Sequence, residues 1–380
     1  MQQIRAHIPF LILLSAAYLA VLLLSLPAAV FYRIDAPSLT ERYLRSQDIT
    51  HDVSGRTFLS DSEIHIAAGL LYAGGADPAV FNFQHTPLAK YLYGISSRIS
   101  GSPYPVQFTF GLTFIALTYF LGVTIFHSRT TGTVAGLLVL TDPVFSHLLG
   151  EILLDLPQAT FLLAFVLLVL HGTRFGLVHG ILLGCAAASK FWTPVAVTAV
   201  LAVAYDAYRT SRFDWRNYIV TAAAAGAVLY ASYFRTILES GGITPILLQA
   251  KIFKYWLHHS ISALPGANVF LFLTGFSAQW WGEKAIGFSP HWSLLWPISL
   301  AGVLTAVILR LLRSGVRLLK EPPAAALIFP VLYLLSLSVQ APFVRYFLLL
   351  LPFLYAGMTA LIIGIPDPLL SSGKEKQVRR

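Results

Sequence analysis

The feature that most constrains this chain is the recurrence of long apolar runs from one end to the other. Residues 8–31, for example, contain no charged side chain, and a run of about 20 apolar residues lets an α-helix cross a bilayer. Overall, 56% of residues are hydrophobic, 11% are charged and the mean hydropathy is +0.70. A transmembrane β-barrel would instead show short segments of alternating polarity. The sequence therefore predicts an all-α polytopic membrane protein.

The first apolar run could also be a secretory signal peptide. Its apolar core is longer than the roughly 7–15 residues usual for such a peptide, and the chain stays hydrophobic after it, so we interpret it as an uncleaved first span. The single cysteine, Cys185, lies inside an apolar run and excludes an intrachain disulfide or a CxxC metal site. The net charge of +9 comes from Lys and Arg at the ends of apolar runs, which favours membrane topology over a nucleic-acid partner.

The basic residues orient the predicted spans. Short connections on the cytoplasmic side of a membrane carry an excess of Lys and Arg. The connections that contain Arg129, Arg174 and Arg209 all lie on one side of the membrane if segment 176–206 crosses it twice. The alternative, one long tilted helix, would bury Lys190 near the centre of the bilayer, at a cost of a few kcal/mol. The segments expected to cross, about ten, are 8–32, 104–126, 132–149, 156–171, 176–189, 192–206, 218–235, 292–312, 323–340 and 343–364.

This orientation places both termini in the cytoplasm and two long connections, 33–103 and 236–291, outside. Residues 1–366 are then one integral membrane domain of the cell membrane, and 367–380 form a basic cytoplasmic tail. Segment 266–281 is apolar enough to be a re-entrant or interfacial helix. If it spanned, the orientation of everything after it would reverse.

The first outer connection contains two expected helix starts. "SLTE" (38–41) and "SDSE" (60–63) match the capping-box pattern, so two short helices are expected along the membrane surface. In the second helix, capping explains Glu63, whereas Asp61 and His65 are four residues apart and share a face. Asp61 is therefore freer to take part in chemistry, with Glu63 as the alternative.

Ionisable side chains gather on the predicted outer side of the membrane. Glu151 and Asp155 lie at the start of a predicted span, where carboxylates that face lipid are costly. This favours a polar cavity for them over positions at the membrane interface. Cations at outer helix ends are either snorkelling side chains or, beside carboxylates, a site for an anionic group such as phosphate. The residues on this side are Asp61, Glu63, His65, His85, Lys90, Glu151, Asp155, Lys190 and Arg345.

Four motifs on this side resemble, in order, those of the GT-C membrane glycosyltransferases. The resemblance is to the branch of protein O-mannosyltransferases and aminoarabinose transferases, and covers about residues 8–206 and 324–364. In this sequence Thr86 replaces the first proline of the family's "HPPL", and Asp-Ser-Glu replaces adjacent Asp-Glu. The motifs are "DSEIHIAAGLLYAGG" with "HTPLAKYLYGI", then "ILLDLPQATFLLAF", "GCAAASKFWTP" and "VRYFLLLLPFLY".

The resemblance implies a GT-C-like fold and an inverting, mannosyltransferase-like transfer from a polyprenyl-phosphate-linked sugar on the non-cytoplasmic side. The general base of the family maps to Asp61, with Glu63 as the alternative, and its second acid maps to Asp155. The acceptor, whether protein, glycan or lipid, and any divalent metal ion stay open. The substrate-binding candidates are His65, His85, Lys90, Glu151, Lys190 and Arg345.

Two other classes of protein also remain open. A transporter or flippase would show pseudo-symmetric halves and charges at mid-membrane, and the sequence shows neither clearly. A non-catalytic accessory subunit with the same fold would tolerate replacement of Asp61 and of Asp155.

Overall fold

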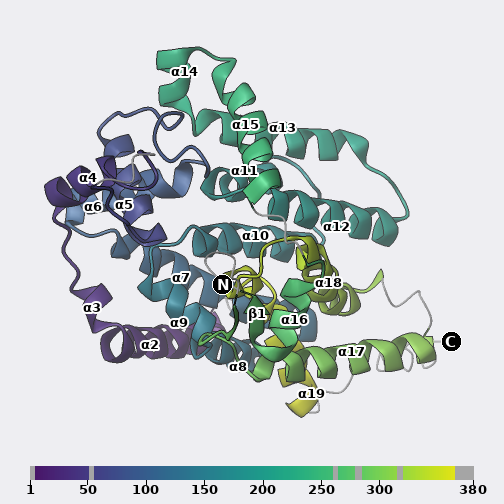
Figure 1. The fold of residues 1–380 in the computed structure, drawn as a ribbon. Helices are drawn as coiled ribbons and strands as arrows, with labels where there is room; N and C mark the ends of the chain where they lie inside the picture. The colour runs from purple at the N-terminus through teal and green to yellow at the C-terminus, as the bar shows by residue number, and fades with distance from the viewer. Residues whose placement is uncertain (1–4, 51–54, 260–263, 279–284, 315–319, 364–380) are drawn as a thin grey trace.

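The computed structural model describes residues 5–50, 55–259, 264–278, 285–314 and 320–363, and the predicted tail 367–380 lies outside them. The described chain is mostly helical (Figure 1), as expected. It departs from the all-α prediction in one antiparallel pair, β1 (Phe276–Ala278) with β2 (Ile286–Phe288). Phe276 and Phe288 face each other in this pair with ring centroids 5.2 Å apart, an aromatic cross-strand contact that stabilises a short ladder.

Helices occupy all the expected spans, but not all are long enough to cross by themselves. Among the described residues three are long and apolar enough, α2, α7 and the segment Pro322–Val339, and α8 with α9 would be a fourth if this pair, bent by 60°, is one span. The chain is therefore an integral membrane protein, and ten spans remain a prediction. The helices are α2 (Ile8–Ser25), α7 (Tyr104–Phe126), α8 (Arg129–Leu140), α9 (Pro143–Gly150), α10 (Asp155–Leu170), α11 (Leu177–Ser189), α12 (Thr193–Thr210), α13 (Trp215–Ala231), α17 (Leu295–Ser314), α18 (Pro322–Ser336) and α19 (Leu351–Ile363).

Proline sets two of the helix boundaries. The first helix ends at Ser25 rather than near residue 32, because Pro27 disfavours the helical conformation at Leu26 and a separate turn, α3 (Pro27–Val30), follows. The stretch 176–206 forms two helices, as expected. Lys190 is extended at the end of α11, and α12 restarts with Pro194 in its first turn, where proline is tolerated.

The connection predicted to be the first outer one folds into short helices, α4 (Ala36–Leu44), α5 (Asp61–Ala73) and α6 (Leu88–Ser100). In α5 the predicted capping box is present, since Ser60 Oγ accepts from the Glu63 amide at 3.2 Å and the Glu63 carboxylate accepts from the Ser60 amide at 3.0 Å. The start expected at Ser38 was wrong. Asp35 caps α4 by accepting from the Ser38 amide at 3.2 Å, which places the helix start three residues earlier.

Helices α5 and α6 pack backbone to backbone through two glycines. A Cβ added at Gly69 would lie 2.3 Å from the Lys90 carbonyl oxygen, and one at Gly94 would lie 1.9 Å from the Gly69 oxygen. Only glycine permits this approach. The pair holds the start of α5, with Asp61, in a fixed relation to the segment before α6, which contains His85.

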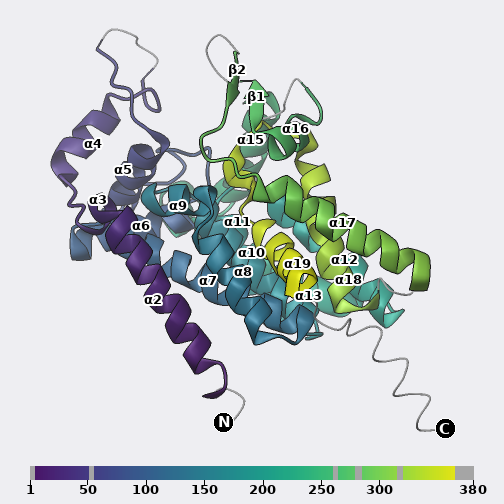
Figure 2. The same cartoon turned by 90° about the horizontal axis from the view of Figure 1, so that it is seen from below.

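The connection predicted to be the second outer one contains α14 (Phe234–Ser240), α15 (Thr244–His259) and α16 (Ala267–Thr274). At 8 residues α16 is too short to cross a bilayer, so this apolar segment does not reverse the predicted orientation. Figure 2 shows α4 and the β1–β2 pair, apart from each other, at the end of the molecule opposite the start of α2.

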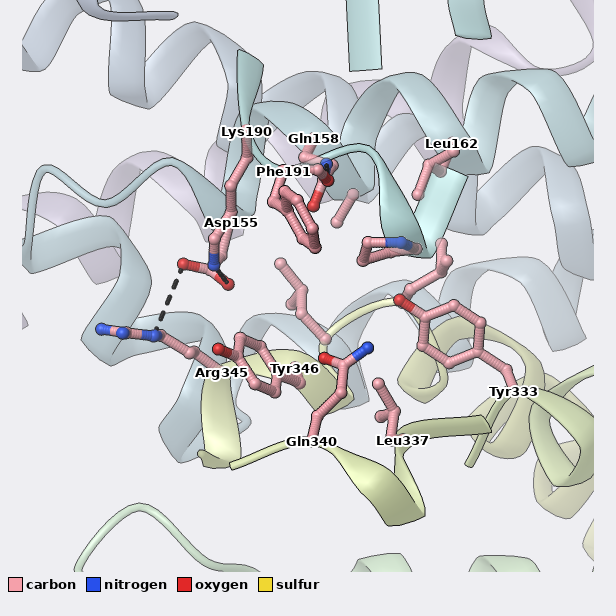
Figure 3. A pocket seen from close by; sticks show the side chains of 14 residues that line it. Asp155, Gln158, Leu162, Lys190, Phe191, Tyr333, Leu337, Gln340, Arg345 and Tyr346 are labelled. Atoms are coloured by element: carbon pink, nitrogen blue, oxygen red, sulfur yellow. Dashed lines mark hydrogen bonds and ion pairs between the residues drawn. The ribbon is translucent and has the colours of Figure 1, made fainter. Parts of the chain in front are cut away.

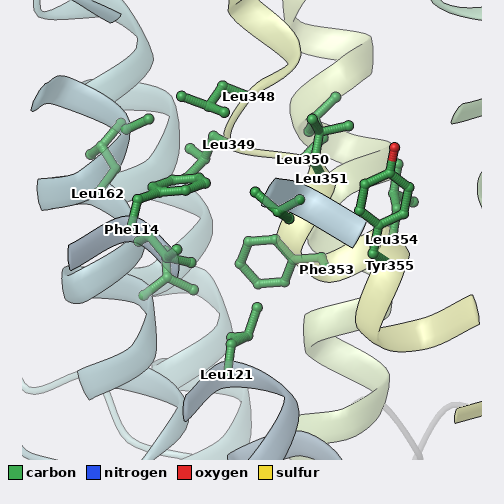
Figure 4. Close-up of a cluster of buried hydrophobic side chains, with 14 of the residues drawn as sticks. Phe114, Leu121, Leu162, Leu348, Leu349, Leu350, Leu351, Phe353, Leu354 and Tyr355 are labelled. Carbon is green, nitrogen blue, oxygen red and sulfur yellow. The ribbon is translucent and has the colours of Figure 1, made fainter. Parts of the chain in front are cut away.

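The hydrophobic core lies where α7, α8, α10 and α19 meet. Phe114 of α7, Leu162 of α10 and Phe353 of α19 are all essentially buried there (Figure 4). This core holds the start of α10, with Asp155, close to the segment that precedes α19. That segment is the short 3-10 helix η3 (Val344–Phe347), which carries Arg345.

Candidate active site

Two carboxylates and two cations meet at one place although they come from distant parts of the chain. Asp61 begins α5, Asp155 begins α10, Lys190 follows α11 and Arg345 lies in η3. Nη1 of Arg345 donates to Oδ2 of Asp61 at 3.1 Å, and Nε of Arg345 lies 3.7 Å from Oδ2 of Asp155. Nζ of Lys190 donates to Oδ1 of Asp155. The four charges therefore balance in one connected network.

The two carboxylates of this network differ in exposure. The side chain of Asp155 is 8% exposed, like its partner Lys190 at 10%, whereas that of Asp61 is 57% exposed. Partial burial acts to raise the pKa of Asp61, but the positive charges of Arg345 and Lys190 hold that pKa below its ordinary value. Asp61 is therefore an ionised, accessible carboxylate at neutral pH, while Asp155 is a buried anchor for both cations.

The network borders a cavity between α10, α12, α18 and η3. Figure 3 shows Asp155, Lys190 and Arg345 at one end of this cavity and Tyr333 at the other. A second cavity, between the α11–α12 turn and α15, is lined by His85, Phe253 and Trp256. Residues that line both cavities are Lys190, Phe191, Gln340 and Tyr346.

Lys190 and Tyr346 stand at the junction of the two cavities. Nζ of Lys190 lies 4.9 Å from the centroid of the Tyr346 ring, which is cation–π distance. A bound anion at this junction would have an apolar cavity on either side of it. Such a place suits an amphipathic ligand with a charged head.

The two predicted histidines lie beside the network as neutral rings. Nδ1 of His65 is 3.0 Å from the Ile152 carbonyl oxygen, so this nitrogen carries the proton and donates. Burial, which outweighs the attraction of Asp61, lowers the pKa of His65 to about 4, and burial likewise lowers the pKa of His85. The rings of His65 and His85 lie 5.8 Å apart, and His85 lies 5.0 Å from Trp256.

Glu63 and Glu151 lie outside the network. One oxygen of Glu63 serves the capping box and the other accepts from Nη2 of Arg42 at 2.9 Å. Burial and the nearby carboxylates of Asp61 and Glu63 raise the pKa of Glu151, against a contact with Ser62 that lowers it. The carboxylates of Glu151 and Asp61 are therefore close enough to repel each other, and Glu151 pairs with neither cation of the network.

Lys90 holds the segment before α6 together and does not reach the cavities. Its fully buried Nζ donates to the Asn82 carbonyl at 2.7 Å, to Asn82 Oδ1 at 2.9 Å and to the His85 carbonyl at 2.7 Å. The Tyr72 hydroxyl oxygen is a fourth acceptor at 3.2 Å, so the three N–H donors of the ammonium group are all occupied within this segment and α5. Burial lowers the pKa of Lys90 to about 7.

Sequence reasoning missed several residues of the site. Gln158 lines the first cavity one helical turn after Asp155, and Gln340 lines both cavities. Trp256 of α15 lines the second cavity and donates from Nε1 to the Gln84 carbonyl at 2.7 Å. Within the described ranges, no group of three or more His, Cys, Asp or Glu is arranged to hold a metal ion.

Comparison with known proteins adds the fold class. No family model and no curated protein sequence matches the chain. Among solved structures, ArnT from Cupriavidus metallidurans bound to undecaprenyl phosphate aligns with a TM-score of 0.57 and 14% identity, over 85% of this chain and 58% of ArnT. The apo oligosaccharyltransferase of Archaeoglobus fulgidus aligns with a TM-score of 0.56 and 13% identity, over 97% of this chain and 52% of that enzyme. The fold is GT-C-like.

The GT-C-like fold predicted from the four sequence motifs is thus confirmed. The chain spans 58% and 52% of the length of these two proteins. At such low identity the likeness concerns the fold, and the chemistry must be argued from the site itself.

Proposed function

We propose that this protein is a membrane glycosyltransferase that moves a sugar from a polyprenyl-phosphate-linked donor to an acceptor on the non-cytoplasmic side. The observation that carries the proposal is the convergence of Asp61, Asp155, Lys190 and Arg345 beside a largely apolar cavity. It supplies a carboxylate that can take a proton, cations for a phosphate and apolar walls for a lipid. The undecaprenyl phosphate bound to the GT-C-fold protein ArnT supports this class of donor.

Lys190 and Arg345 would stabilise the leaving phosphate. When the bond between the sugar C1 and the phosphate oxygen breaks, its electron pair stays on the phosphate, which gains negative charge. Guanidinium can grip two phosphate oxygens and ammonium adds a point charge, so both favour this charged state. Asp155 contacts both cations and holds them in position before the donor arrives.

Asp61 is the proposed general base. Its carboxylate is ionised and the more exposed of the two, so an acceptor group can approach it. As the acceptor atom attacks C1 from the face opposite the phosphate, its proton passes to Asp61 and the configuration at C1 inverts. Glu63 is the weaker candidate, because both of its oxygens already have partners.

Donor binding would also make Asp61 a stronger base. The guanidinium of Arg345 pairs with Asp61 at 3.1 Å in the structure, and a donor phosphate would compete for the same nitrogen atoms. Loss of this ion pair raises the pKa of Asp61 toward its ordinary value and makes the carboxylate a better proton acceptor. The base would therefore become most effective when the donor is in place.

The decisive experiment incubates the purified protein with a panel of polyprenyl-phosphate sugars, beginning with mannose because of the motif resemblance. The readout is release of polyprenyl phosphate in the presence of membrane extract as a source of acceptor. Consumption of one donor by the wild type and not by Asp61→Asn supports the proposal. Movement of donor between leaflets without consumption would indicate a flippase, and donor binding without turnover would indicate an accessory subunit.

A further inference from the structure

The turn that carries Lys190 needs support, because it ends a helix. The last carbonyl groups of a helix have no partners within the helix. After Ser189 the backbone of Lys190 is extended, with φ −151° and ψ −169°, so it does not continue the hydrogen-bond pattern of α11. The carbonyl groups around this turn are therefore free to accept from other parts of the protein.

Two buried side chains from other elements occupy these carbonyl groups. Nε2 of Gln158 donates to the Ala186 oxygen at 3.2 Å and to the Phe191 oxygen at 2.8 Å. Oγ1 of Thr86 lies 2.8 Å from the oxygens of both Ala187 and Lys190, so its single proton is shared between them. Thr86 is 0% exposed and Gln158 is 6% exposed, and such contacts are strong in a site that excludes water.

The two donors connect the three segments that build the site. Gln158 lies on α10 one turn after Asp155, on the same helix face. Asp155 contacts the side chain of Lys190, while Gln158 contacts the backbone on both sides of it. Thr86 follows His85 directly and so ties the first outer connection to the same turn.

We infer that Thr86 and Gln158 are positioning residues, a backbone clamp that holds the Lys190 ammonium at the junction of the two cavities for an anionic headgroup. This inference rests on the proposed function for the identity of that headgroup. The clamp is a feature of this chain's own sequence, because Thr86 occupies the position of the first proline in the "HPPL" motif that this segment resembles. Proline has no hydroxyl group to donate.

The test compares Thr86→Val, which keeps the shape and removes the hydroxyl group, with Thr86→Ser, which keeps the hydroxyl group. Two quantities are measured in the full-length protein: binding of undecaprenyl phosphate, and the acetylation rate of Lys190 by an amine-specific reagent, followed by peptide mass spectrometry. Thr86→Val should weaken binding about tenfold and raise the acetylation rate several-fold, because one buried hydrogen-bond donor is lost. Thr86→Ser should restore both values, and Gln158→Leu should behave like Thr86→Val.

Thr118→Val is the matched control. Thr118 is equally buried, but its hydroxyl group donates at 2.9 Å to the Phe114 carbonyl of its own helix, α7. This variant should lower the melting temperature without changing lipid binding or Lys190 acetylation. If Thr86→Val shows only that pattern, the clamp has no positioning role. If the wild type binds no undecaprenyl phosphate, the proposed function fails, and the acetylation rate alone decides whether the clamp positions Lys190.

Discussion

Arg345 pairs with Asp61 at 3.1 Å although 284 positions separate the two residues in the chain. The same guanidinium group lies 3.7 Å from Asp155, so it joins the first outer connection to α10. A ligand phosphate entering here would replace a carboxylate partner of Arg345 rather than find a free cation. Under the proposed function, binding of the donor and release of Asp61 would thereby be linked through one side chain.

The first prediction concerns the guanidinium group itself. Arg345→Ala should weaken binding of undecaprenyl phosphate by about ten- to hundredfold, and Arg345→Lys should weaken it less, because ammonium keeps the charge but loses the two-point contact. The measurement is lipid affinity together with melting temperature.

Arg209→Ala is a suitable control for Arg345. Arg209 pairs with Asp206 at 2.9 Å and its side chain is 23% exposed, close to the 21% of Arg345, but it lies at the predicted cytoplasmic end of α12. It should lose stability only. Unchanged lipid affinity in Arg345→Ala would remove Arg345 from the site and leave snorkelling as its explanation.

The second prediction concerns the buried pair of Lys190 and Asp155. Lys190→Met should destabilise the protein by about 3 kcal/mol, because a carboxylate is left buried without its closest partner. The double variant Asp155→Asn/Lys190→Met should recover much of the melting temperature and still bind lipid phosphate poorly. Recovery of binding along with stability would show that the pair is structural and takes no part in ligand recognition.

The sequence predicts a set of ionisable residues on one side of the membrane, and the structure brings four of them together in pairs that the sequence does not show. The capping role that the "SDSE" pattern predicts for Glu63 is confirmed, and the choice of Asp61 as the base stays a prediction. Positive charges in short loops predict that Asp155, Lys190 and Arg345 lie on one side of the membrane. Which cation meets which carboxylate depends on helix packing over long distances, and no local pattern encodes that.

The residues that sequence reasoning missed or misplaced are of types that do not by themselves indicate a functional site. Thr86 and Gln158 are common polar residues whose role appears only once the Lys190 turn lies against them. Lys90 lay in a motif that resembled a binding site, yet the fold of its own loop uses every proton of its ammonium group. The number of spans was also beyond sequence reasoning, because short apolar helices such as α11 are compatible with spanning or with partial burial.

The third prediction concerns pH. The pKa of His65 is about 4 in the folded protein and its ordinary value is 6.5, so below pH 6.5 the unfolded chain binds a proton that the folded protein does not. Stability should therefore be highest above pH 6.5 and fall by about 3 kcal/mol as the pH approaches 4. Melting temperatures measured between pH 7.5 and 4.5 should fall more steeply for the wild type than for His65→Gln. Parallel curves would show that His65 titrates normally.

The fourth prediction concerns topology. In a Cys185→Ala background, Val80→Cys should react with a membrane-impermeant maleimide added from outside, because Val80 is 64% exposed in the first outer connection. Arg212→Cys, in the exposed connection between α12 and α13, should react only after permeabilisation. The reverse pattern would place the site on the cytoplasmic side.

The central claim is that Asp61 is the general base, and Asp61→Asn tests it most directly. Asparagine keeps the size and removes the proton-accepting charge, so sugar transfer should fall by about two to four orders of magnitude. Donor binding should be unchanged or tighter, because Arg345 loses a competing partner. Glu63→Gln keeps the capping contact and should transfer at a normal rate. An active Asp61→Asn beside an inactive Glu63→Gln would contradict the account and make Glu63 the base.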